Sequence, residues 1–105
     1  MSKRVAAKAT KSKRAEARAA KWARAAAIKV SRGCESGHCR VDPAIVKSSP
    51  LFLDFDHLPG VVKRGNVSDL LRRDCSWSTI MAEINKCRVL CKFCHALHTD
   101  GQRNK

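Results

Sequence analysis

Two spaced pairs of cysteines are the clearest chemical signal in this 105-residue chain. Cys91 and Cys94 are separated by two residues, and Cys34 and Cys39 by four. A Cys-x2-Cys turn aims two thiolates at one tetrahedral ion, and a second pair from elsewhere in the chain completes the site. The spacing therefore predicts a structural Zn²⁺ site made of these four cysteines, with His38 as a substitute ligand in the looser first pair. Free structural thiols are the alternative.

Carboxylates and imidazoles form a second group of candidate ligands. Asp54 and Asp56 alternate with apolar residues in a short segment that is followed by His57, and His95 directly follows the second cysteine pair. Such ligands suit Mg²⁺, Mn²⁺ or a transition-metal ion. If zinc draws Cys94 toward the first pair, His95 comes close to the segment that ends at His57. The chain would then hold one closed structural site and one open site.

The charge of the chain is concentrated at its N-terminal end. Lys and Arg outnumber Asp and Glu by 22 to 9, and most of the resulting charge of +13 lies in residues 1–32. This segment is rich in Ala and lacks Pro and Gly, so we expect a helix over about residues 3–30. Such a basic arm is typical of proteins that bind a polyanion, nucleic acid above all, without sequence preference; a solvated basic tail is the alternative. A helical projection puts Arg4, Lys8, Lys11, Arg14, Arg18, Lys21 and Lys29 on one stripe, and Val5, Ala9, Ala19, Ala23, Ala27 and Val30 on the other side.

Residues 33–105 are expected to form one small domain that a bound metal stabilises, because so short a segment buries only a thin core. Alternation over 51–56 predicts a strand with both aspartates on one face. Apolar spacing predicts helices over 67–71, with Ser68 as a cap, over 77–86 and over 93–98, and a strand over 88–90. Residues 41–50 are predicted to be a connection, and Cys75 and Cys87 to be buried free thiols.

The sequence predicts neither a membrane span nor a signal peptide. It contains no run of 18 apolar residues, and basic residues recur throughout the first 29 positions. A span requires about 20 consecutive apolar residues, and a signal peptide requires an uninterrupted apolar segment. We therefore expect a cytoplasmic protein in a reducing compartment, where closely spaced cysteines bind metal rather than form disulfides.

Four parts of the sequence, taken in order, form one motif pattern. They are Leu53–His57, Ser76–Trp77 with Ile80, Ala82–Cys87 and Leu90–His95. Together they resemble small HNH endonucleases, and more narrowly the zinc-containing kind found in bacteriophage and bacterial genomes. The resemblance covers about residues 33–99 and includes the order and approximate spacing of the four cysteines. It implies an α+β fold of the ββα-metal type, with two strands and a helix around a catalytic divalent cation.

What the resemblance implies for function is hydrolysis of phosphodiester bonds in double-stranded DNA in the bacterial host cell. Asp56 and His95 match the ligands of the catalytic cation, Mg²⁺, Mn²⁺ or another divalent ion, which would stabilise the departing 3′ oxygen. His57 matches the general base that activates water. DNA would bind through the basic arm and the active-site cleft, and a phage packaging component is a possible protein partner.

The chain departs from the HNH pattern at the middle asparagine. Lys86 stands where the family usually has this residue, which orients the base. Asn85 is our candidate for that task, and Asn66 lies further upstream. His98 follows His95 by three residues and could face the same way, although the motif does not require it. Two alternative functions stay open: a non-catalytic zinc-dependent nucleic-acid-binding protein, such as a regulator or packaging accessory, and a basic protein that associates with RNA or the ribosome.

Overall fold

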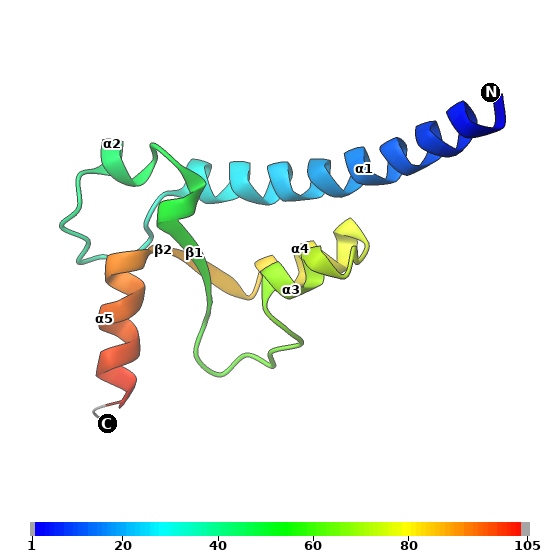
Figure 1. Ribbon diagram of the computed structural model, residues 1–105. Helices are drawn as coiled ribbons and strands as arrows, with labels where there is room; N and C mark the ends of the chain where they lie inside the picture. Colours follow the sequence, from blue (N-terminus) through cyan, green and yellow to red (C-terminus); the bar gives the residue numbers. More distant parts are fainter. Residues whose placement is uncertain (1, 104–105) are drawn as a thin grey trace.

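The computed structural model describes the backbone of residues 2–103 and the side chains of residues 13–99. It is a small α+β fold in which a long helix, α1 (Ser2–Arg32), runs past a body that contains a two-stranded sheet. Figure 1 shows α1 extending well beyond this body, with the two chain ends at opposite extremes of the molecule. The side chains of Arg4, Val5, Lys8, Ala9 and Lys11, which the sequence assigns to the two sides of the arm, lie outside the described ones.

Helix α1 confirms the expected helical arm and ends at a glycine. Gly33 has φ of +66° and donates its N–H to the carbonyl of Lys29 at 2.9 Å. That left-handed conformation is one that glycine adopts without steric cost, and it is a common way to end a helix. All side chains from residue 13 to residue 20 are exposed, so this part of the arm makes no packed contact with the body.

The side of α1 that packs against the body is not the expected alanine side. Ala19, Ala23 and Ala27 are exposed, whereas Ala25 is 2% exposed and belongs to the core. Ile28 packs beside it. The contact face therefore falls within the basic stripe and includes two of its lysines, Lys21 and Lys29.

Two cations of α1 are held against the body. Lys21 donates to the carboxylate of Asp74 at 2.8 Å, and the guanidinium of Arg24 lies 4.2 Å from the ring centroid of Trp77. Contacts of these kinds contribute about 1 kcal/mol or less each where solvent reaches them. They set the angle at which the arm leaves the body more than they stabilise the fold.

The sheet pairs β1 (Leu53–His57) with β2 (Cys87–Cys91) in antiparallel register, with Phe55 opposite Val89. The expected strand start at residue 51 is wrong, because a 3₁₀ turn, η1 (Pro50–Phe52), precedes β1. The side chain of Ser49 accepts the N–H of Leu51 and caps this turn. Proline at its first position favours the turn, since its φ is preset and it needs no N–H partner.

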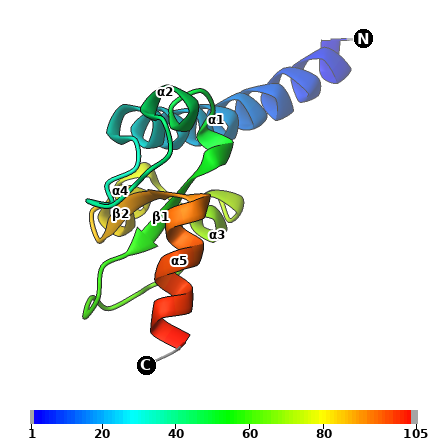
Figure 2. The same ribbon diagram turned by 90° about the vertical axis from the view of Figure 1, so that its left-hand side faces the viewer.

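Four further helices surround the sheet. They are α2 (Pro43–Val46), α3 (Val67–Arg72), α4 (Trp77–Ile84) and α5 (Lys92–Arg103). Helix α2 lies in the segment that the sequence assigned to a connection. Asn66 rather than Ser68 occupies the N-cap position of α3, and Ser76 caps α4 through the N–H of Thr79. Figure 2 shows α5 lying across the sheet.

The core consists of two clusters of buried residues. The first lies between α1, α3, α4 and β2 and contains Ala25, Val67, Leu70, Leu71, Ile80, Ile84 and Cys87. The second contains Val46, Leu53, Val89, Leu90, Cys91 and Cys94, and Phe55 packs against both. Two of the four predicted metal ligands are thus part of the second core. No helix in the described part of the chain is both long and apolar enough to cross a membrane.

Candidate metal centre and active-site face

The four predicted thiol ligands meet at one point. The sulfur atoms of Cys34, Cys39, Cys91 and Cys94 all lie within 4.8 Å of one another, and all four cysteines are free of disulfides. Cys39 Sγ and Cys91 Sγ are 3.8 Å apart. A tetrahedral ion with Zn–S bonds of about 2.3 Å places two sulfurs about 3.8 Å apart, whereas a disulfide would require about 2.05 Å. The cluster could therefore hold a metal ion such as zinc, and exposed His38 lies outside it.

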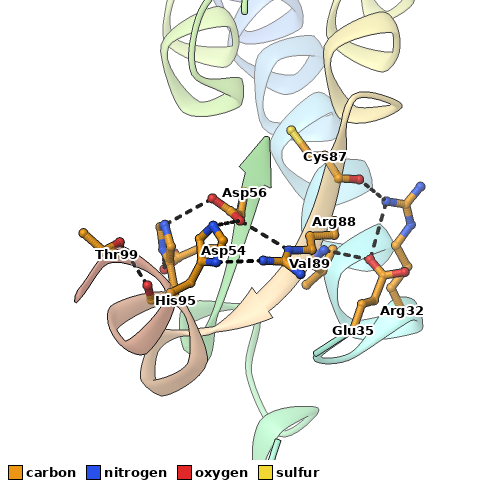
Figure 3. Close-up of polar contacts among 10 residues, drawn as sticks. Arg32, Glu35, Asp54, Asp56, Cys87, Arg88, Val89, His95 and Thr99 are labelled. Atoms are coloured by element: carbon orange, nitrogen blue, oxygen red, sulfur yellow. Dashed lines mark hydrogen bonds and ion pairs between the residues drawn. The ribbon is translucent and has the colours of Figure 1, made fainter. Parts of the chain in front are cut away.

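Two hydrogen bonds between Glu35 and Val89 hold the first cysteine pair beside the second. Glu35 donates its N–H to the carbonyl of Val89 at 2.7 Å, and its side chain accepts the N–H of Val89 at 2.7 Å. Arg32 contacts Glu35 and donates to the carbonyl of Cys87 (Figure 3). The loop that carries Cys34 thus lies against β2, whose last residue is Cys91.

Burial of the cluster favours a cation beside its sulfur atoms. Burial, and then hydrogen bonds with the neighbouring thiols, raise the pKa of the Cys94 thiol to about 12. Thiolates rather than thiols are the metal ligands, so a divalent ion must offset this cost before all four sulfurs can ionise. Four sulfur donors select zinc over the oxygen-seeking Mg²⁺ and Ca²⁺.

A second group of side chains meets between β1 and α5. Asp54 and Asp56 lie on the same face of β1, as predicted, and His95 reaches them from the first turn of α5 (Figure 3). His95 Nδ1 is 3.1 Å from Asp54 Oδ2, and His95 Nε2 is 3.6 Å from Asp56 Oδ1. One imidazole therefore bridges the two carboxylates.

The Asp54 contact determines which nitrogen of His95 is free to bind a cation. Desolvation opposes ionisation of Asp54, but hydrogen bonds from Lys92 and His95 outweigh it and lower the pKa of this carboxyl. Asp54 is then a carboxylate that only accepts, so His95 Nδ1 carries the proton. In the neutral ring Nε2 then has the lone pair, and this nitrogen faces Asp56. A carboxylate that orients a histidine in this way is a common partner of metal-binding imidazoles.

Arg88 and His98 complete the surroundings of Asp56. Arg88 Nε lies 3.4 Å from Asp56 Oδ2, and its Nη2 lies 3.1 Å from His98 Nδ1. Because guanidinium only donates, His98 Nδ1 accepts, and the neutral His98 ring carries its proton on Nε2, 3.9 Å from Asp56. In this state Arg88 occupies His98 Nδ1, and the protonated Nε2 is the nitrogen that faces Asp56.

His57 does not join Asp56 and His95. Successive side chains leave a strand on opposite faces, so His57 turns toward α4, where its Nε2 lies 2.6 Å from Glu83 Oε2. The predicted convergence of Asp56, His57 and His95 therefore holds for two of the three side chains. Asn85 was our candidate for the residue that orients His57, but the side chain that contacts His57 is Glu83. Asn85 is exposed at the C-cap of α4.

Glu83 is the functional candidate that sequence reasoning missed. Its side chain is 1% exposed, and besides His57 it accepts the N–H of Arg64 at 3.1 Å and the ammonium of Lys86 at 3.1 Å. Desolvation opposes ionisation, but the hydrogen bonds from His57, Lys86 and Arg64 lower the Glu83 pKa to about 2. Glu83 is therefore a carboxylate that holds the proton of His57 on Nε2 and ties the loop after β1 to α4. The sequence offers one sign of this contact: Glu83 lies three positions before Lys86, a spacing that lets the two side chains pair on a helix.

Replacing Glu83 by glutamine is expected to lower the free energy of unfolding by about 1–3 kcal/mol at pH 7, since hydrogen bonds to a charged acceptor are lost. The folded-state pKa lies below the ordinary value of 4.5. The stability contributed by this carboxylate is therefore complete above pH 4.5 and is lost as the pH falls toward 2. Urea unfolding of both proteins between pH 7 and pH 3 should show a difference that narrows below pH 4.5. A difference that stays constant with pH would contradict this account.

No protein-family model, curated protein or solved structure matches this chain, so its functional assignment rests on the chemistry and geometry of its own residues.

Proposed function

We propose that this chain is a metal-dependent DNA endonuclease of the HNH type that it resembles. The observation that carries the proposal is the meeting of Asp56 and His95 across β1 and α5, with His95 Nε2 3.6 Å from Asp56 Oδ1. Mg²⁺ is commonly held by one or two protein ligands together with substrate phosphates and water, so two side chains suffice. The four-cysteine cluster at the start of α5 supports the proposal because it anchors the helix that carries His95.

The residues of this face have separate tasks in the proposed reaction. A divalent cation bound here would neutralise a phosphate oxygen and stabilise the departing 3′ oxygen. Asp54 holds His95 in the required tautomer through its contact with Nδ1. Arg88 contacts one oxygen of Asp56 while His95 faces the other, so the carboxylate keeps an oxygen for the cation.

His57 remains the candidate general base. Glu83 accepts from Nε2, so the neutral ring carries its lone pair on Nδ1, the nitrogen that would take a proton from water. His57 is the last residue of β1. A water molecule activated by His57 would therefore have to reach a phosphate bound at Asp56 around this end of the strand.

The exposed part of α1 would add affinity for DNA. Residues 13–20 carry three basic side chains, Lys13, Arg14 and Arg18, against the single acid Glu16. Contacts of such residues with phosphates raise affinity with little sequence preference. This activity would belong in the cytoplasm of a bacterial cell, where duplex DNA is available.

A plasmid nicking assay with Mg²⁺ or Mn²⁺ tests the proposal. We expect the wild-type protein to convert supercoiled plasmid to nicked product, and His57→Ala to lower the rate by about 10²–10⁴-fold, the usual contribution of a general base. His57→Ala removes one of the three partners of the buried Glu83. His57→Gln therefore serves as a second variant, whose side-chain amide can still donate to Glu83. His38→Ala, at an exposed histidine outside both groups, should cleave like the wild type.

Two outcomes of this assay would overturn parts of the proposal. Undiminished cleavage by His57→Ala would remove His57 as the base. If neither the wild-type protein nor any variant cleaves the plasmid while DNA binding is retained, the result would favour the alternative function, non-catalytic zinc-dependent nucleic-acid binding. The observation that favours this second function is the placement of His57 against Glu83 rather than beside Asp56.

A further inference from the structure

A cavity of about 300 Å³ opens beside the Asp54 and His95 pair. The end of α1, the middle of β1, the start of α3 and the first turn of α5 all contribute to its wall. Its lining includes Lys29, Asp54, Phe55, Asn66, Ser68 and His95. The cavity is therefore continuous with the face on which we place the cation, and it is also the point where the basic arm reaches that face.

Lys29 is the residue of the arm that enters this cavity. It is half-buried, and its ammonium lies 5.2 Å from the ring centroid of Phe55. Among the described side chains, no carboxylate lies within ion-pairing distance of it. Burial lowers the pKa of Lys29, and the nearby Asp54 only partly opposes this effect. The ammonium has thus lost part of its hydration without gaining an ion pair, which is costly unless a charged partner binds there.

The other polar groups of the cavity fit an anion. Asp54 carries the negative charge of the lining, and it already contacts Lys92 at 2.9 Å and His95 at 3.1 Å. Ser68 Oγ accepts from Arg72, so its hydroxyl hydrogen is free to donate. The side chain of Asn66 makes no capping bond to α3; its Nδ2 donates one hydrogen to Asp69 Oδ2 at 3.5 Å and keeps the other. A cation with unused donors beside it is the usual composition of a phosphate site.

We infer that this cavity is a phosphate subsite in which Lys29 binds a backbone phosphate next to the one held at Asp56 and His95. The inference rests on the proposed nuclease function and deepens it. The last turn of α1 then contributes to the active-site face itself, whereas the exposed turns before it supply only general attraction. The ligand class is a nucleic-acid strand bearing at least two consecutive phosphates.

Paired substitutions on the same helix separate these two contributions. Lys29→Gln and Lys13→Gln each remove one positive charge from α1, but Lys13 is fully exposed and far from the cavity along the helix. The probe is a 5′-phosphorylated thymidine dinucleotide, titrated in the presence of Mg²⁺ and followed by amide chemical shifts. We expect shifts at residues 66–68 in the wild type, about tenfold weaker binding for Lys29→Gln, and unchanged binding for Lys13→Gln. Lys29→Arg should keep most of the affinity.

Long duplex DNA gives the complementary result. Each Lys→Gln variant removes one lysine. The slope of log affinity against log salt concentration should therefore become less steep by about the amount that one phosphate contact contributes. Equal effects of the two variants on the dinucleotide, or shifts confined to residues outside the cavity, would overturn the subsite. A wild-type protein that binds the dinucleotide in this pattern but fails to nick plasmid would overturn the nuclease function and leave the subsite standing.

Discussion

Removal of the metal from the four-cysteine cluster is expected to abolish cooperative unfolding of the body. The cluster joins the loop at residue 34 to the end of β2 and the start of α5, and Cys91 and Cys94 are themselves core residues. Structural zinc sites contribute an apparent 10–16 kcal/mol, roughly, in small peptides, which equals or exceeds the total stability of about 5–15 kcal/mol of an ordinary domain. We therefore expect about one zinc per chain in the purified protein and loss of its thermal transition after chelation.

A single substitution in the cluster provides the matched test. Cys91→Ser should reproduce the effect of chelation, whereas Cys75→Ser should leave the melting temperature within a few degrees, since Cys75 is a half-buried thiol outside the cluster. Elemental analysis and thermal melting of the three proteins would give the comparison. A metal-free protein that melts like the untreated one would show that the apolar core is sufficient and the thiol cluster is incidental.

Replacing Asp56 by asparagine is expected to lower the plasmid nicking rate by about 10³-fold. A cation that polarises a phosphoryl oxygen supplies several kcal/mol of transition-state stabilisation, and each 1.4 kcal/mol, roughly, corresponds to a factor of ten in rate. Asp54→Asn should cost less, about 10–100-fold, because Asp54 acts through His95 rather than on the cation. Asp42→Asn, at the exposed N-cap of α2, where asparagine caps as well as aspartate, is the control with no expected effect.

Metal binding distinguishes this role of Asp56 from a structural one. Titration calorimetry with Mn²⁺ should show a site in the wild type that is lost in Asp56→Asn and weakened in Asp54→Asn, while all three proteins keep their zinc and their melting transition. Full activity of Asp56→Asn would remove the proposed cation site. Loss of the melting transition would show that the contact with Arg88, rather than cation binding, is the main contribution of Asp56.

Part of this site could be predicted because it depends on local geometry. The four-cysteine cluster follows from spacing, since a Cys-x2-Cys turn points two thiolates at one tetrahedral ion. The shared face of Asp54 and Asp56 follows from the two-residue period of a strand. The position of His95 follows from its place directly after Cys94. Apart from the joining of Cys34 and Cys39 with Cys91 and Cys94, each inference required only residues that are close in the sequence.

The rest depends on contacts between distant segments. The period that puts Asp54 and Asp56 on one face also turns His57 to the other, but its partner Glu83 lies 26 positions later. Sequence reasoning assigned α4 only an apolar face, and nothing local shows that a buried glutamate can be satisfied by His57, Lys86 and a loop N–H. The orientation of α1 has the same origin. Its charge pattern predicts two sides, whereas contacts with the body decide that the basic side, at Ala25, is the one that packs.

The position of Cys91 has a consequence for how the two strands align. Cys91 is both the last residue of the β2 ladder, opposite Leu53, and a member of the thiol cluster. A slip of one residue between the strands would turn Asp54 and Asp56 away from α5 and bring Phe55 there instead. It would also pull one sulfur out of tetrahedral position. A bound ion would thereby act as a check on strand alignment, so that a chain able to hold its zinc has also brought the correct carboxylates to face His95.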